Sequence, residues 1–113
     1  MSDRVWTPED IAKLALGGAV CSDHRYQGGV PEWDDVERVV AASAEGLGDW
    51  DVSTEAILLL KDGRYATAWE WSDSSGHGCQ CDGAVVFSDS VEAALQGIDG
   101  RAAERLKAVL DAS

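Results

Sequence analysis

The stretch that decides the fold is EAILLLKDGRYATAWEWSDSSGHGCQCDGAVVFS, which runs from Glu55 to Ser88. Its pair Asp62-Gly63 is preferred in two-residue type I′ hairpin turns, because both turn positions need a positive φ. Apolar and aromatic residues flank this pair on both sides, as is typical of β-strands. The sequence therefore predicts an antiparallel hairpin here, and the apolar run 84–87 predicts a third strand.

The predicted turn also sets the register of the hairpin and so the composition of its two faces. Leu60 is expected opposite Tyr65, and Leu58 opposite Thr67. Because both faces are then largely apolar, we expect each to be covered by helices or by another molecule, such as a second copy of the chain in a homodimer. The first face would carry Leu58, Leu60, Tyr65, Thr67, Trp69 and Trp71, and the second Ile57, Leu59, Ala66 and Ala68.

Two helices are predicted before these strands. In the first, Thr7 is a good N-cap, Asp10 can complete a capping box, and the two glycines at 17–18 predict the end. A second helix is predicted over Pro31–Glu45, because apolar residues recur there at helical spacing. Its expected buried stripe consists of Trp33, Val36, Val40, Ala44 and Leu47.

Two more helices are predicted after the strands. Asp89 is expected to cap the first, with Glu92 at its third position and Gly97 at its end. Beyond Gly100 a further amphipathic face is formed by Ala102, Ala103, Leu106, Val109 and Leu110. We therefore expect one α+β domain over residues 1–113, a three-stranded antiparallel meander with two N-terminal and two C-terminal helices (α-α-β-β-β-α-α).

The net charge of −12, from 21 acidic and 9 basic residues, limits the classes of partner. Such a charge argues against direct binding to nucleic acid or to an anionic membrane. No apolar run approaches the ~20 residues of a membrane span. The N-terminus lacks the layout of a secretory signal, so we expect a cytoplasmic protein. A partner protein with a basic surface is favoured instead.

Eight of the acidic residues fall between Glu32 and Glu55, against a single base, Arg38. This acidic segment would attract a basic partner, while a Trp between two aspartates and a His in the loop 73–83 would add anchoring contacts. The alternative is a solvated acidic face without a dedicated partner. The candidate partner-binding residues are Asp34, Asp35, Glu37, Asp49, Trp50, Asp51 and His77.

All three cysteines and both histidines occur in two short segments, 21–24 and 77–81. Zinc prefers four tetrahedral ligands drawn from thiolate and imidazole groups, although the spacing here matches no common zinc-finger pattern. The alternative is one small buried cysteine and two free thiols, with no cofactor bound. The best zinc-ligand set would be Cys21, His24, Cys79 and Cys81, with His77 as a substitute.

A Cys-dependent hydrolase is a further alternative, with Cys79 or Cys81 as nucleophile and His77 as base. Catalytic pairs usually come from different elements and need a third, orienting group, which this pattern does not identify. The sequence also has no nucleophile elbow and no phosphate-binding loop. We therefore expect a binding protein and not an enzyme.

The run AWEWSDSSGHGCQCDG resembles a motif in small, acidic, mostly uncharacterised proteins of actinobacteria and their phages. In those proteins a Trp-rich strand leads into Asp-x-[Ser/Thr]-Gly-x-x-Cys-Gln and then into a short apolar strand. The resemblance covers about residues 57–95, and Cys21 and Cys81 are not expected in the motif. It implies a phage or prophage accessory protein in a bacterial host cell. The matching residues are Trp71, Asp73, Ser75, Gly76, Cys79 and Gln80.

The sequence thus predicts a small acidic module that binds another protein through charge and shape complementarity. The sharpest version is a phage-type inhibitor that imitates a phosphate array and occupies the nucleic-acid-binding surface of its partner.

Overall fold

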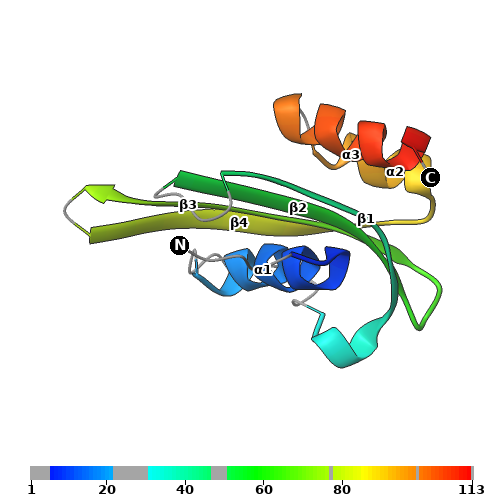
Figure 1. The fold of residues 1–113 in the computed structure, drawn as a ribbon. Helices are drawn as coiled ribbons and strands as arrows, with labels where there is room; N and C mark the ends of the chain where they lie inside the picture. Colours follow the sequence, from blue (N-terminus) through cyan, green and yellow to red (C-terminus); the bar gives the residue numbers. More distant parts are fainter. Residues whose placement is uncertain (1–5, 22–30, 47–50, 77, 99, 113) are drawn as a thin grey trace.

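The chain forms a four-stranded sheet with helices on both sides (Figure 1). The computed structural model describes residues 6–21, 31–46, 51–76, 78–98 and 100–112, with the backbone alone at 18–21, 74–76 and 78–81. Within this part of the chain, no helix is long and apolar enough to cross a membrane. In chain order the elements are α1 (Pro8–Cys21), the 3-10 helix η1 (Trp33–Asp35), β1 (Val36–Glu45), β2 (Asp51–Leu60), β3 (Tyr65–Gly76), β4 (Gly78–Ser88), α2 (Val91–Gln96) and α3 (Gly100–Ala112).

The four strands follow one another as an antiparallel meander in the order β1-β2-β3-β4. Helix α1 lies on one side of this sheet, and α2 and α3 lie on the other, so the domain has three layers (Figure 1). The predicted α+β class is confirmed. The described residues form four strands and three α-helices, however, where the sequence predicted three strands and four helices.

The segment Pro31–Glu45, predicted as a helix, contains the short helix η1 followed by strand β1. Two irregularities interrupt the pairing of β1 with β2, one between Val36 and Arg38 and one between Val39 and Ala41. Each inserts one residue, so the residues packed toward α1 recur at every third position instead of every second. This spacing imitates the helical period and explains the wrong prediction. The residues that show it are Val36, Val39 and Ala42.

The stripe predicted for that helix is therefore divided between the two sides of the sheet. Trp33 and Val36 pack against the α1 side, whereas Val40 packs against the opposite side. Ala44 pairs with Thr54 in the sheet, and Leu47 lies outside the described residues.

The β2–β3 hairpin lies where it was predicted, but its turn is one residue longer. The Gly63 N–H donates to the Leu60 carbonyl over 3.0 Å, and the Leu60 N–H donates to the Arg64 carbonyl over 2.9 Å. Three residues thus connect the strands, and Gly63 adopts the positive φ of 93° that closes such a turn. Tyr65 lies opposite Leu59 and not opposite Leu60, so the predicted register is wrong by one residue.

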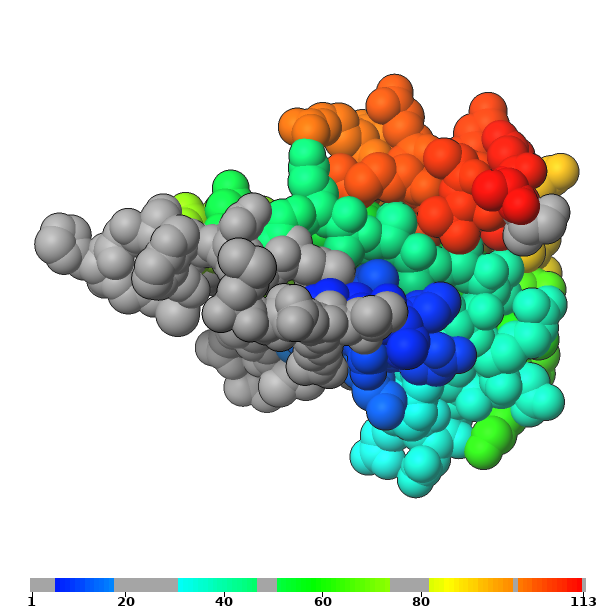
Figure 2. Space-filling model, viewed as in Figure 1, coloured from blue at the N-terminus to red at the C-terminus, as the bar shows by residue number. Residues whose placement is uncertain are grey.

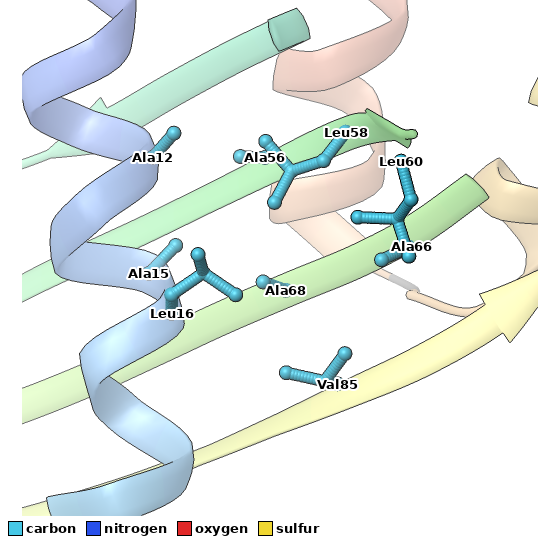
Figure 3. Close-up of a cluster of buried hydrophobic side chains, with 9 residues drawn as sticks. All are labelled: Ala12, Ala15, Leu16, Ala56, Leu58, Leu60, Ala66, Ala68 and Val85. Carbon is cyan, nitrogen blue, oxygen red and sulfur yellow. The ribbon is translucent and has the colours of Figure 1, made fainter. Parts of the chain in front are cut away.

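A one-residue shift exchanges the faces of one strand relative to the other. Toward α2 and α3, Ile57 is buried with Ala41, Ala94 and Leu106, and Tyr65 packs at the edge of this cluster. Small side chains fill the contact with α1, which lets the helix approach the sheet closely (Figure 3). This second cluster consists of Ala12, Ala15, Leu16, Ala56, Leu58, Leu60, Ala66, Ala68 and Val85.

The segment 73–83, predicted as a loop, forms the ends of β3 and β4. Backbone pairing runs through Asp73↔Gln80 to Gly76↔Gly78, with one irregularity on the β3 side. Its Gly- and Ser-rich composition is typical of a loop, but backbone pairing requires no particular side chains. Since β2 begins at Asp51, opposite Asp73, the end of β3 and the start of β4 extend beyond β2 (Figure 1).

The predicted helix ends agree only in part with the ends in the structure. The Asp10 N–H donates to the Thr7 hydroxyl and the Thr7 N–H donates to Asp10, which confirms the capping box. Helix α1 continues through the glycines at 17–18 to Cys21, because packing of the helix on the sheet outweighs their low helix propensity. Helix α2 is capped by Ser90 and not by the predicted Asp89.

Candidate binding groove

A buried ionic network fixes α3 above the sheet. Glu55, in the centre of β2, is fully buried and points toward α3. Its carboxylate accepts hydrogen bonds from Arg105 Nη2 at 2.5 Å and from the Ser43 hydroxyl at 2.6 Å. Arg105 Nη1 also pairs with Glu45 over 2.9 Å, and Glu45 pairs in turn with Arg101. The network therefore joins β1, β2 and the first half of α3.

The two glutamates and two arginines of this network balance each other in charge. The hydrogen bonds from Arg105 to Glu55 raise the pKa of the guanidinium, so Arg105 keeps its positive charge. A buried carboxylate needs this combination of a counter-ion and a second donor to offset its lost hydration. We interpret the network as a brace that holds α3 over the sheet. Figure 2 shows α3, in orange to red, lying against the green and cyan strands.

Beside this brace, the α2–α3 side of the sheet is hollowed into a groove. One hollow, of about 560 Å³, lies between the start of α3 and the ends of β1, β2 and β3, with Trp71 and Asp51 in its wall. A second, of about 300 Å³, adjoins it and is lined by Trp69 and Ile98. Both are bordered by Ser53 and Ala102, so they lie next to each other, and we call the two together the groove. We call these two parts the polar hollow and the apolar hollow.

The strand alternation of β3 places both tryptophans in this groove. Trp69 pairs with Glu55 and Trp71 with Ser53, so both rings lie on the α2–α3 side of the sheet. Trp71 Nε1 donates a hydrogen bond of 2.9 Å to Asp51, which holds the carboxylate at the edge of the indole ring. Among the described residues, no cation pairs with Asp51. The groove thus presents an aromatic wall and a carboxylate, Asp51, that no cation of the described ranges neutralises.

The predicted partner-binding residues that the structure describes lie at two distant places on the sheet. Asp34 and Asp35 lie in η1, next to the β2–β3 turn, where the Lys61 N–H donates to the Asp35 carbonyl. Glu37 follows at the start of β1. Asp51 lies at the opposite end of β2, about 30 Å away along a ten-residue strand. Asp49, Trp50 and His77 lie outside the described residues.

The zinc-ligand set is only partly described. Cys21 is the last residue of α1, and Cys79 and Cys81 lie in β4, while His24 and His77 lie outside the described residues. The described residues contain no group of three His, Cys, Asp or Glu side chains placed to hold a metal ion. Zinc binding and the Cys-dependent hydrolase stay predictions.

The α1 side of the sheet carries two polar residues of a different kind. Thr54 is buried, and its hydroxyl has no hydrogen-bond partner among the described residues. Its neighbour across the strands is Glu70, whose pKa is raised by burial. Neither residue lines the polar or the apolar hollow.

The sequence predicted one residue of the groove, Asp51, and missed the others. The sequence predicted that Trp69 and Trp71 share one face of the hairpin, but its wrong register placed Trp69 opposite Ala56 and not opposite Glu55. Arg101 and Arg105, spaced one helical turn apart, and the acidic residues that end β1 and occupy β2 were the available signals. Only the three-dimensional pairing shows that these two groups meet.

No protein-family model, curated protein or solved structure matches this chain. The comparisons therefore assign neither a family nor a function, and the resemblance to actinobacterial and phage proteins stays a prediction.

Proposed function

We propose that this protein is a small acidic interaction module, which binds the basic surface of a partner protein through the groove between α3 and the sheet. The observation that carries the proposal is Asp51, an exposed carboxylate that accepts a hydrogen bond from Trp71 and pairs with no cation among the described residues. A partner's basic side chain would supply the missing charge, and the tryptophans would supply apolar contact area.

The overall charge supports the same class of partner. At −12 the chain repels nucleic acid and accelerates its encounter with basic proteins. Many basic proteins carry their charge on the surface that contacts nucleic acid, so a phage-type inhibitor of such a protein is the sharpest version of the proposal. Self-association through a sheet face is a weaker alternative, because helices already lie on both faces.

The test is retention of a panel of basic nucleic-acid-binding proteins on the immobilised chain at low and at high salt. We expect retention that decreases steeply with salt, because the attraction between exposed charges is screened. Asp51→Asn should weaken retention. The matched control Glu37→Gln removes one exposed negative charge at the far end of the sheet and should leave retention nearly unchanged. Equal retention by all three chains would overturn the groove as the binding surface.

A further inference from the structure

The shape and the charges of the groove indicate which kind of ligand it can bind. We propose that the groove binds an extended segment of the partner in which an arginine and an aliphatic residue are separated by one residue. This inference rests on the proposed function and specifies the ligand of the same site.

The polar hollow favours a cation. The arginines that border it are already neutralised, since Arg105 pairs with Glu45 and Glu55, and Arg101 pairs with Glu45. The remaining charge is that of Asp51. One oxygen of this carboxylate accepts from Trp71, which leaves the other directed away from that bond. A cationic side chain can therefore pair with Asp51 beside the Trp71 ring.

Arginine fits this arrangement better than lysine. A planar guanidinium stacks on an aromatic ring while it donates hydrogen bonds to a carboxylate in the plane of its own atoms. An ammonium group can make the ion pair but cannot stack in this way. The Trp71–Asp51 pair presents a ring and a carboxylate side by side, so we expect a preference for arginine over lysine.

The apolar hollow favours an aliphatic side chain. It has the two polar lining residues Ser53 and Gln96 and no formal charge, and its other walls are Trp69, Ile98, Gly97 and Ala102. The side chain of a leucine or isoleucine would cover Trp69 and Ile98 there and remove their exposed surface from water. The polar hollow is thus expected to bind an arginine side chain, and the apolar hollow an aliphatic one.

The distance between the hollows determines the spacing. Trp69 and Trp71 are two residues apart on one strand, so their side chains stand about 6.6 Å apart along it. An extended peptide lying along β3 places its own residues i and i+2 at the same spacing and on the same side. Residues i and i+3 of such a peptide point to opposite sides and cannot occupy both hollows.

The experiment uses labelled Gly/Ser peptides that contain one Arg and one Leu, with binding measured by fluorescence anisotropy to the full chain. Arg-x-Leu and Leu-x-Arg are both included, because the groove does not fix the direction of the peptide. The comparison peptides have the same composition with two intervening residues, or contain Lys or Glu in place of Arg, or Ala in place of Leu. The protein variants are Asp51→Asn, Ile98→Ser and the control Glu37→Gln, each checked for an unchanged circular dichroism spectrum.

We expect one of the two i,i+2 arginine peptides to bind tightest, with affinity reduced about tenfold by Asp51→Asn and unchanged by Glu37→Gln. Ile98→Ser should weaken the Leu-containing peptide and leave a peptide with Ala in place of Leu unaffected. Equal binding of the i,i+3 peptide, or tighter binding of the Glu peptide at Arg101, would overturn the inference.

Failure of the inference and failure of the proposed function are distinguishable. If basic proteins are retained through Asp51 but no i,i+2 preference appears, the ligand assignment is wrong and the interaction module stands. If neither peptides nor basic proteins bind in a salt-dependent way, both are wrong.

Discussion

Two fully buried threonines on opposite sides of the sheet have different surroundings. On the α2–α3 side, the Thr67 hydroxyl donates a hydrogen bond of 2.6 Å to the Ala94 carbonyl. On the α1 side, the Thr54 hydroxyl has no partner among the described residues. Glu55, the next residue along β2, is again on the α2–α3 side and has both a counter-ion and a hydroxyl donor.

This difference indicates that the two sides of the sheet are stabilised by different kinds of contact. The α1 side is a contact of small apolar residues, in which a close approach between helix and sheet provides the stability. The α2–α3 side combines a smaller apolar cluster with polar bonds that position α2 and α3 and leave a groove beside them. We infer that the packed contact with α1 provides enough stability for the α2–α3 side to hold a network of charged residues.

The largest predicted effect follows from breaking the brace on the α2–α3 side. Arg105→Met removes the counter-ion of Glu55 and leaves a fully buried carboxylate with Ser43 as its remaining donor. We expect a loss of about 3–5 kcal/mol in the free energy of unfolding, measured by urea denaturation. The matched control Arg101→Met, at a site with 77% of the side chain exposed, should cost less than about 1 kcal/mol.

The double variant Glu55→Met/Arg105→Met checks the cause of that loss. Replacing both charges by apolar groups removes the unpaired carboxylate, so most of the lost stability should return. A double variant no more stable than Arg105→Met alone would contradict the ionic explanation.

The next effect tests the close packing on the α1 side. Ala68→Leu adds three carbon atoms where β3 faces α1, and the helix must shift to accommodate them. We expect a loss of about 1–3 kcal/mol in thermal or urea unfolding. Ala102→Leu, on the groove side, has open space beside it and should change stability by less than about 0.5 kcal/mol. Equal effects at the two sites would show that the two sides are not packed differently.

Much of the fold was predictable because its signals are local. The Thr7–Asp10 capping box, the hairpin at Asp62-Gly63 and the two C-terminal helices each depend on residues within one turn or one strand. The segment Pro31–Glu45 was wrongly predicted as a helix because the two bulges of β1 give its apolar residues a helix-like spacing. These bulges depend on the pairing of β1 with β2, and this pairing cannot be seen in the sequence.

The candidate site was less predictable for a related reason. A turn longer by one residue changed the partner of Trp69 from Ala56 to Glu55, and it placed Trp71 opposite Ser53. This change converts a predicted core face into the wall of a groove. The ion pairs that border the groove join residues 50 or more positions apart, so no local pattern could have identified them.

A smaller effect of opposite sign is predicted for the two buried threonines. Thr54→Val keeps the shape of the side chain and removes a hydroxyl that has no described partner, so we expect a gain of about 1 kcal/mol in the free energy of unfolding. Thr67→Val removes a hydroxyl that bonds to α2 and should cost about 1 kcal/mol. A loss of stability in Thr54→Val would mean that its hydroxyl is hydrogen-bonded in solution.

The smallest effect is a pH dependence from Glu70, which lies beside Thr54 on the α1 side. Burial raises the pKa of this carboxyl in the folded state, so the folded chain binds a proton more tightly than the unfolded chain. The contribution of Glu70 to the free energy of unfolding is therefore fully present below about pH 4.3, the pKa of Glu in the unfolded chain. It is lost as the pH rises through the higher pKa of Glu70 in the folded chain.

Glu70→Gln removes the ionisable group and leaves a neutral side chain of nearly the same shape. We expect this variant to be slightly more stable than the parent at neutral pH, with the difference vanishing in mildly acidic solution, in melting curves recorded across that range. The control Glu104→Gln alters an exposed side chain of α3 and should follow the parent at every pH. A Glu70→Gln variant that is less stable at neutral pH would indicate that the ionised carboxylate has a stabilising partner. The α1 side would then contain a satisfied charge, and the contrast between the two sides would have to be abandoned.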